Sequence, residues 1–455
     1  MSILKNQNNT QNTLKSILII IILGVLIRLL LLTVIAGHPE RGINPDSESY
    51  IKPAISLSST GIYPPDSGKR TPIYPLFIAL IYFLFGQNLV WIMVGQILLD
   101  AITIYLTYIL GSRFLPRPAA ILGACLMAVN IDSITYDFYY LTETLATFMT
   151  LAALLTWEKG YREEHRGWIV FGAILMGMSV LTRPIVLYFP MVLVICLLLK
   201  RERPLAKRIF DAAVYSTIFL VTLLPWMVRN YNTIGSPTIS TISQYNLYYY
   251  NAASLEAHLR GVGEDQVRKE YIPLQEQRLI ELGLENTFGN QARVQSMMAR
   301  EVILSHPIQY ILVHLKSDLN SLLPDTNILE LLGMTSGGKG TLDVLNDQGL
   351  MAAIRHYFGG KTWLIAVLLP YMLMLGLIYI AGLMGVIQLI KERNWSASIL
   401  LIATCAYFLL IPGAPSIARF RVPIMPYLSL LAGLGTYATY LLWQKRASRQ
   451  ATRRK

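Results

Sequence analysis

Charged residues are scarce in this sequence. Asp, Glu, Lys and Arg make up 15% of the 455 residues, whereas a soluble globular chain averages roughly 25%. Hydrophobic residues make up 54%, and the mean hydropathy is +0.46. Because the missing charge coincides with long apolar stretches, the composition excludes an ordinary soluble domain and indicates a membrane protein.

Cysteine and histidine are also few. The three cysteines, Cys125, Cys196 and Cys405, all fall in apolar stretches, which argues against a disulfide framework. The six histidines are scattered without the spacing of zinc ligands. The sequence also lacks the internal repeat, with paired interrupted helices in both halves, that is typical of many transporters.

The apolar stretches predict about ten transmembrane helices in an all-α, polytopic membrane protein. Apolar length and the Lys and Arg content of the short loops define them. The expected spans are about 16–36, 88–110, 118–135, 141–157, 167–182, 185–199, 209–228, 363–390, 396–412 and 424–443. The first is long enough to cross a bilayer, so we expect it to be retained rather than cleaved as a signal peptide.

The formal net charge of +12 raises the question of nucleic-acid binding, but the position of the charge argues against it. Basic residues gather in short loops and in the C-terminal tail, as the positive-inside rule predicts for cytoplasmic segments. The expected partner of this charge is the bilayer, with no nucleic acid. We expect both termini in the cytoplasm and the chain in a prokaryotic inner (plasma) membrane.

These spans divide the chain into four parts. Residues 1–228 are expected to form a membrane core with a first external loop at 37–87, and residues 229–361 a small, α-rich external domain with 11 Lys and Arg against 13 Asp and Glu. Residues 362–444 carry the C-terminal transmembrane helices, and residues 445–455 form a basic cytoplasmic tail. The apolar stretch 73–85 is too short to cross the membrane, so we expect an external juxtamembrane helix.

Three acidic residues at the expected external surface are candidates for chemistry. Asp46 and Glu48 lie two positions apart in the first loop and can accept a proton from a hydroxyl or hold a divalent cation. Glu143 lies at the outer end of a span, where an ionisable group is costly and is a functional candidate. Structural interpretations stay open: Asp46 as the cap of a helix that includes Tyr50, and Glu143 as a first-turn acid.

Arginines at the expected external ends of the spans are the second set of candidates. Because basic residues there oppose the positive-inside rule, they favour an anionic partner, and Arg suits bidentate contact with phosphate. The candidates are Arg183, Arg229, Arg419 and Arg421, with snorkelling to the interface as the structural alternative. Arg28 lies inside the first span and requires an acid, a phosphate or the interface as its partner.

Two further stretches carry weaker signals. The tyrosine-rich segment 245–250, which begins with Tyr245, can stack on sugar rings or belong to the aromatic belt of the interface. Residues 333–340 nearly spell a phosphate-binding P-loop, but Gly340 replaces the Ser or Thr that holds Mg²⁺, so we interpret them as a loop.

Taken together, these motifs resemble the GT-C superfamily of membrane glycosyltransferases, in the branch of protein O-mannosyltransferases and the lipid A aminoarabinose transferase. The matches run along nearly the whole chain. They are Arg28, Asp46-Ser-x-x-Tyr50, Arg70-Thr-Pro-Ile-Tyr-Pro-Leu, Thr-Glu143-Thr-Leu, Leu-Thr-Arg183-Pro, Pro-Trp-x-x-Arg229-Asn-Tyr and Arg419-Phe-Arg421-Val-Pro-x-x-Pro. Each motif alone is weak, and their order and placement together are specific.

The resemblance implies transfer of a monosaccharide from a polyprenyl-phosphate-linked donor to a lipid, glycan or protein acceptor, with inversion, at the external face. Asp46 maps to the main catalytic acid and Glu143 to the second, with Glu48 a further catalytic candidate. Arg419, Arg421, Arg229, Arg70 and Arg183 are expected to bind the donor phosphate, and Tyr50, Asp137 and Tyr245 to contact substrate.

The first loop departs from some relatives, because Ser47 separates Asp46 from Glu48 where those relatives have adjacent acids. The identity of the base therefore stays open, as does a requirement for a divalent cation, Mg²⁺ or Mn²⁺, at Asp46, Glu48 and Glu143. Two other functions also stay open: an O-antigen polymerase or ligase acting on pyrophosphate-linked donors, and a transporter.

Overall fold

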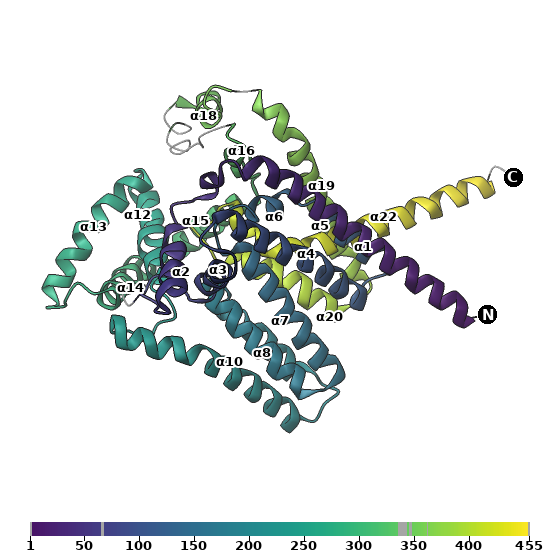
Figure 1. Ribbon diagram of the computed structural model, residues 1–455, viewed down its shortest axis with the longest axis horizontal. Helices are drawn as coiled ribbons and strands as arrows, with labels where there is room; N and C mark the ends of the chain where they lie inside the picture. Colours follow the sequence, from purple (N-terminus) through teal and green to yellow (C-terminus); the bar gives the residue numbers. More distant parts are fainter. Residues whose placement is uncertain (1, 65–67, 335–343, 345–347, 362, 454–455) are drawn as a thin grey trace.

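The computed structural model describes residues 2–64, 68–334, 344, 348–361 and 363–453, and every regular element in them is helical (Figure 1). The glycine-rich loop at 335–340 lies outside these described residues. The first half comprises α1 (Ser2–Ile35), η1 (Pro39–Gly42), α2 (Glu48–Thr60), α3 (Ile73–Phe85), α4 (Leu89–Phe114), α5 (Arg117–Ala128), α6 (Ile131–Tyr136), α7 (Glu143–Glu163), α8 (Arg166–Thr182), η2 (Pro184–Tyr188), α9 (Pro190–Leu199) and α10 (Leu205–Ile234).

The second half begins with a run of mostly short helices. It comprises α11 (Ile242–Asn246), η3 (Leu247–Ala252), α12 (Ala253–Arg260), α13 (Glu264–Glu281), α14 (Phe288–Ser305), α15 (Pro307–Asp318), η4 (Leu319–Leu322), α16 (Asn327–Leu331), α18 (Leu350–Tyr357), α19 (Leu364–Lys391), α20 (Trp395–Ser398), η5 (Ile399–Ala403), α21 (Thr404–Leu410), η6 (Ala418–Ile424) and α22 (Met425–Arg453). The elements η3 and η5 are π-helical, and η6 is a 3₁₀ helix.

The distribution of side chains is that of a multi-pass membrane protein. Large apolar side chains such as Leu30 on α1 and Leu377 on α19 are exposed, which is the surface that lipid tails cover. Charged side chains such as Arg28 and Asp100 are buried among the helices. Among the described residues, four helices are long and apolar enough to cross a membrane: Asn12–Ile35, Leu89–Phe114, Leu205–Ile234 and Leu364–Lys391. Shorter apolar helices occur elsewhere in the chain, and a total of about ten spans stays a prediction.

Some expected spans are interrupted. The stretch 118–135 divides into α5 and α6, because Asn130 caps the second helix: its side-chain oxygen accepts a hydrogen bond from the backbone nitrogen of Ser133 at 2.8 Å. The stretch 396–412 contains the π-helical turn η5 between α20 and α21. The short apolar helix α3 has the bounds expected from the sequence.

Close helix packing brings α19 and α22 together. A Cβ atom at Gly385 would lie 2.0 Å from the carbonyl oxygen of Leu431, and one at Gly435 would lie 1.9 Å from that of Ala381. The two backbones therefore touch where no side chain intervenes, as is common between membrane helices.

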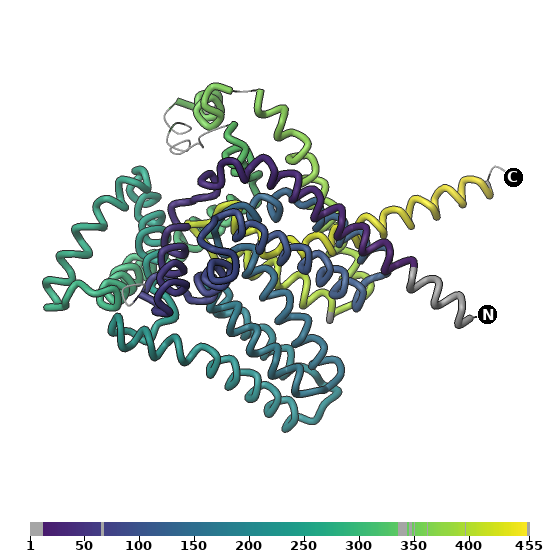
Figure 2. The backbone as a smooth tube through the Cα atoms, in the orientation of Figure 1, coloured from purple at the N-terminus to yellow at the C-terminus, as the bar shows by residue number. Residues whose placement is uncertain are grey.

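The molecule has two distinct ends. The beginning of α1 and the end of α22 project from one end, whereas α12, α13 and α14 gather at the opposite end (Figures 1 and 2). The loop that follows α1 and the helix α2 lie beside this second group. Residues that are distant in sequence, namely the first loop and the segment 240–300, therefore meet.

Candidate functional site

Five segments of the chain bring a cluster of acids and arginines together. Asp46 comes from the turn before α2, Arg70 from the segment before α3, Glu143 from the first turn of α7, Arg183 from the end of α8 and Arg419 from η6. We call these five residues the carboxylate–arginine cluster. The members come from segments up to 373 positions apart in the chain, so the fold rather than local sequence creates the cluster.

Alternating charges connect the members of the cluster. Arg70 Nη2 lies 2.6 Å from Asp46 Oδ1, and Arg419 Nη1 lies 3.1 Å from Asp46 Oδ2. Arg419 Nε in turn lies 3.2 Å from Glu143 Oε1, which also accepts a hydrogen bond from Arg183. Arg419 thus bridges the two carboxylates that the sequence singled out.

Burial differs sharply between the two acids. The Asp46 side chain keeps 33% of its exposure, whereas Glu143 is fully buried and its Oε2 has no hydrogen-bond partner among the described residues. A buried carboxylate is costly unless it is paired, and Arg183 and Arg419 supply the opposite charge beside Glu143. Of these two acids, Asp46 is the one that a ligand can reach from outside.

Electrostatics keep Asp46 ionised. Burial favours the neutral carboxyl, but the charges of Arg70 and Arg419 outweigh burial and hold the pKa of Asp46 below its ordinary value. With Lys69 beside them, four cationic side chains face two carboxylates, which leaves an excess of two positive charges. This excess suits a phosphate group, which carries one charge as a diester and up to two as a monoester.

Asp46 does not cap α2, which was the structural alternative. The N-cap residue is Ser47, whose hydroxyl accepts a hydrogen bond from the backbone nitrogen of Asn44 at 2.9 Å. The Asp46 side chain is turned toward the arginines instead. Ser49 assists, because its hydroxyl accepts a hydrogen bond from Arg70 Nε at 2.8 Å.

Arg421 does not join the cluster, contrary to the expectation from the sequence. Residues two apart in a 3₁₀ helix, which has three residues per turn, point in different directions. Arg419 faces Asp46, while Arg421 is fully buried and holds Asp132 at 2.6 Å. Arg421 also donates to Tyr371 at 2.9 Å, so its charge is satisfied inside the protein.

Arg229 lies at the edge of the region rather than in the cluster. Its guanidinium donates to the carbonyl oxygen of Pro64 and packs 4.8 Å from the Trp226 ring. Pro64 lines a cleft of about 490 Å³ whose wall also includes Lys52, Lys69 and Arg70. We call this the basic cleft. Arg229 therefore positions one rim of the basic cleft.

The acids do not form a metal site. Glu48 is exposed and pairs with Lys52 at 2.6 Å, and no group of three His, Cys, Asp or Glu ligands gathers in the part of the chain that the structure describes. Both oxygens of Asp46 already face arginines. The donor set therefore does not fit the cation expected at Asp46, Glu48 and Glu143.

Asp137 and Tyr50 have structural partners. Arg28 Nε lies 2.7 Å from Asp137 Oδ2, and Arg28 also pairs with Asp100, so the buried arginine of the first span has acids as partners. The Asp137 side chain is fully buried and pairs with Arg28, so it is not available to contact a substrate. Tyr50 is buried edge-on against Tyr74 with ring centroids 5.3 Å apart, and the Arg70 guanidinium lies 4.9 Å from its ring. The Tyr50 ring therefore packs against the Arg70 guanidinium and helps to position it.

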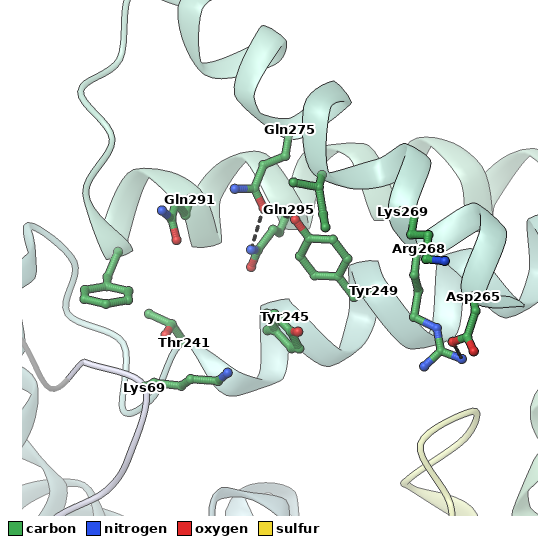
Figure 3. Close-up of a pocket in the computed structure, with 12 residues that line it drawn as sticks. Lys69, Thr241, Tyr245, Tyr249, Asp265, Arg268, Lys269, Gln275, Gln291 and Gln295 are labelled. Carbon is green, nitrogen blue, oxygen red and sulfur yellow. Dashed lines mark hydrogen bonds and ion pairs between the residues drawn. The ribbon is translucent and has the colours of Figure 1, made fainter. Parts of the chain in front are cut away.

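Tyr245 lines a second cleft, of about 430 Å³, at the end of the molecule that carries α13 and α14 (Figure 3). We call it the amide cleft. Its other lining residues are Lys69, Thr241, Tyr249, Asp265, Arg268, Lys269, Ile272, Gln275, Phe288, Gln291 and Gln295. Lys69 belongs to both clefts, and its neighbour Arg70 holds Asp46. The two clefts therefore meet beside the carboxylate–arginine cluster.

Sequence reasoning missed Lys69, Ser49 and the glutamines of the amide cleft. Lys69 stands directly before the Arg70 motif, and that adjacency was its only signal. The glutamines lie about 200 residues further along the chain on α13 and α14, where nothing in the pattern connects them to the first loop.

Residues 69–228 match the model of a family described as dolichyl-phosphate-mannose-protein mannosyltransferase. Residues 69–228 thus carry the signature of a glycosyltransferase family. The matched region contains Arg70, Glu143 and Arg183, whereas Asp46 and Arg419 lie outside it and meet it in the folded chain. The resemblance inferred from the motifs is thus confirmed. No curated protein matches the sequence.

Solved structures support the GT-C-like fold. The chain is similar to the archaeal oligosaccharyltransferase AglB from Archaeoglobus fulgidus in complex with an inhibitory peptide and a dolichol-phosphate, with a TM-score of 0.53 and 14% identity over 97% of this chain and 52% of that one. The apo form of the Archaeoglobus enzyme gives 0.52, with the same identity and coverage. The chain therefore spans about half the length of these proteins. ArnT from Cupriavidus metallidurans bound to undecaprenyl phosphate gives 0.41, with 14% identity over 91% of this chain and 77% of that one.

Proposed function

We propose that this protein transfers a monosaccharide from a polyprenyl-phosphate-linked donor to an acceptor hydroxyl, with inversion at the anomeric carbon. The observation that carries the proposal is the accessible Asp46 carboxylate, held between Arg70 and Arg419 at the meeting point of two clefts. The family match over residues 69–228 supports it. The donor of this chain is proposed by analogy with relatives whose structures contain dolichol-phosphate or undecaprenyl phosphate.

In the proposed reaction Asp46 acts as the general base. The acceptor oxygen forms a bond to the anomeric carbon as the bond from that carbon to the phosphate oxygen breaks, and the hydroxyl proton passes to Asp46. The electron pair of the broken bond leaves with the polyprenyl phosphate, whose charge changes from that of a diester to that of a monoester. Arg70 and Arg419 stabilise this growing charge without any proton transfer.

The donor phosphate also changes the basicity of Asp46. In the free protein both arginines serve Asp46 and keep its pKa low. A phosphate that binds between them shares their charge, and the pKa of Asp46 rises toward that of a better base. Glu143 and Arg183 hold Arg419 in place from behind and do not touch the substrate.

We further propose that the site faces the outside of an inner (plasma) membrane that the chain crosses about ten times, with both termini in the cytoplasm. Helices α12–α14 lie at one end of the molecule, and α1 and α22 project from the opposite end (Figure 1). This arrangement is consistent with the proposed orientation. The division into a membrane core (1–228), an external domain (229–361), C-terminal spans (362–444) and a cytoplasmic tail (445–455) is part of the same proposal.

A transfer assay tests the proposal. Purified full-length protein in detergent is offered radiolabelled polyprenyl-phosphate sugars, with membrane extract as the acceptor. We expect wild-type protein to move label in single-sugar steps and Asp46→Asn to lose this activity. Glu40→Gln is the matched control, because Glu40 is an exposed acid of the same loop that pairs with His38. Polymeric products would favour a polymerase, and flux into sealed vesicles without a covalent product would favour a transporter; either result overturns the proposal.

A further inference from the structure

The amide cleft has the size and the wall of a ligand site. Its volume of about 430 Å³ falls within the range of roughly 300–1,000 Å³ that is usual for small-molecule sites. Helices α11, η3, α13 and α14 supply most of its lining residues, and Figure 3 shows Tyr245, Tyr249, Gln291 and Gln295 around the space between them. No residue of the carboxylate–arginine cluster lines this cleft, so it is distinct from the proposed reaction centre.

Fixed amide groups form one wall of the cleft. Gln275 Oε1 accepts hydrogen bonds from Gln295 Nε2 at 2.7 Å and from the Tyr249 hydroxyl at 3.1 Å (Figure 3). These bonds leave the Gln275 nitrogen and the Gln295 carbonyl oxygen without a partner among the described residues, although both side chains are more than nine-tenths buried. A free donor and a free acceptor are therefore available on this wall, and a ligand group that both donates and accepts fits them.

Aromatic side chains also line the cleft. The ring centroids of Tyr245 and Tyr249 lie 4.8 Å apart, and Phe288 is a further lining residue. Such rings offer flat apolar surface next to polar handles. Hydroxyl groups beside a flat face of C–H groups are the chemistry of a sugar ring.

The backbone ties the cleft to the reaction centre. The Ser240 hydroxyl donates to the carbonyl oxygen of Lys69 at 2.5 Å, and the backbone nitrogen of Thr241 donates to that of Gly68 at 3.3 Å. Thr241 and Lys69 line the cleft, and the next residue, Arg70, holds Asp46. The charge of Asp46 also contributes, after burial, to raising the pKa of Tyr245, which shows that the two groups lie within electrostatic reach.

We propose that the amide cleft binds the acceptor and that the acceptor is a glycan. Its sugar rings lie against Tyr245 and Tyr249 with hydroxyls on the Gln275–Gln295 pair, and the next sugar presents its free hydroxyl past Lys69 to Asp46. This inference rests on the proposed function for the identity of the reaction, but binding of a glycan does not depend on transfer.

The test measures binding and transfer separately. The probe is the pool of oligosaccharides released from source membranes after protease digestion and mild-acid removal of lipid. Binding of this pool to the full-length Asp46→Asn protein in detergent is measured by saturation-transfer NMR. We expect binding to Asp46→Asn, and at least a tenfold weaker affinity when Gln295→Ala or Gln291→Ala is added. Gln291 lines the cleft at a partly exposed position, so we expect Gln291→Ala to fold even if the buried substitution Gln295→Ala does not.

A matched control and the opposite outcomes complete the test. Gln277→Ala removes an exposed glutamine of α13 that bonds only Glu281, and it should leave binding unchanged. Absence of binding, or binding that the cleft variants do not weaken, overturns the inference. In the transfer assay, label found on peptide or on lipid instead of the released glycan also overturns it. Binding without transfer would leave the glycan site standing and refute the proposed reaction.

Discussion

Asp46 is paired through both of its oxygens and still keeps a third of its exposure. An ordinary ion pair on the surface contributes little to the free energy of unfolding, about 1 kcal/mol or less. Here two arginines from distant segments converge on one accessible carboxylate, an arrangement that places positive charge in excess at the meeting point of two clefts. Such a group is expected to act on a ligand rather than to hold the fold together.

The pH dependence of transfer should reflect the low pKa of Asp46. Its folded pKa lies below the ordinary value of about 3.9, so the carboxylate stays ionised throughout the neutral range and gains a proton only as the pH falls below that value. We expect the rate of transfer at low donor concentration to be flat from about pH 5 to pH 8. A rate that falls by half or more on acidification from pH 7 to pH 6 would assign the base to another group.

Arg421 and Asp132 should behave as a structural pair. Breaking one partner of a buried ion pair costs about 3–5 kcal/mol, because it leaves an unpaired buried charge. We expect Arg421→Leu and Asp132→Leu each to lower the midpoint of thermal unfolding strongly, and the double variant to lower it by much less than the sum. Additive losses, or a selective rise of the donor KM in Arg421→Leu, would indicate that Arg421 contacts substrate.

The elements around the site show which features local sequence determines. Helices α3, α8, α10 and α19 follow from apolar length: α3 has the expected bounds, α8 and α19 nearly so, and α10 extends a few residues further at both ends. The break between α5 and α6 does not follow from apolar length, because the local cap that Asn130 forms with Ser133 starts a new helix within the apolar stretch. The 3₁₀ turn η6 has no signal in apolar length either. For the same reason the sequence assigned Arg419 and Arg421 to one role.

Helix α19 supplies a test of the close approach to α22. A side chain at Gly385 would clash with the Leu431 carbonyl. A Cβ at Gly376, which lies earlier in the same helix, would meet nothing within 4 Å. We expect Gly385→Ala to lower the unfolding temperature in detergent by several degrees and Gly376→Ala to leave it unchanged or slightly raised. Equal effects of the two variants would mean that the helices do not touch at Gly385.

The segment that leads into α16 contains a pH-sensitive acid. Burial, opposed by a hydrogen bond from the Asn327 backbone, raises the pKa of Asp325 to about 6. The folded chain thus binds a proton more tightly than the unfolded one, whose value is about 3.9. The stabilising effect is complete below about pH 4 and is lost as the pH rises through 6, with a size on the order of 3 kcal/mol.

Thermal unfolding from pH 4.5 to pH 7 checks this effect. We expect the wild-type midpoint to fall with rising pH in this window and the slope to become shallower in Asp325→Asn. Asp265→Asn, at an exposed carboxyl on α13, is the control and should keep the wild-type slope. A slope that is unchanged in Asp325→Asn would show that Asp325 is ionised throughout the window.

In the whole molecule, most of the architecture and part of the site could be predicted from the sequence. Composition and apolar length predicted an all-helical membrane protein, and the motifs predicted a resemblance that the family match over residues 69–228 supports. Asp46, Arg70, Glu143, Arg183 and Arg419 were among the candidates, and the fold brings these five together.

The rest was beyond sequence reasoning because it depends on contacts between distant segments. The amide cleft joins Lys69 to glutamines of α13 and α14, and polar residues on a helix carry no periodic signal that distinguishes a binding wall from a solvated face. Glu48 looked equivalent to Asp46, yet it is Asp46 that the arginines reach, while Glu48 pairs with its own helix neighbour Lys52.

The most direct test of the account follows the phosphorus atom of the donor. Purified protein, a polyprenyl-phosphate monosaccharide and membrane-derived acceptor are monitored together by ³¹P NMR. We predict that the diester signal converts to a monoester signal in step with the appearance of one new glycosidic bond per phosphate. The conversion should require Asp46 and persist in Glu40→Gln. An unchanged diester signal with wild-type protein, or equal conversion by Asp46→Asn, would contradict the claim that the carboxylate–arginine cluster is the site of sugar transfer.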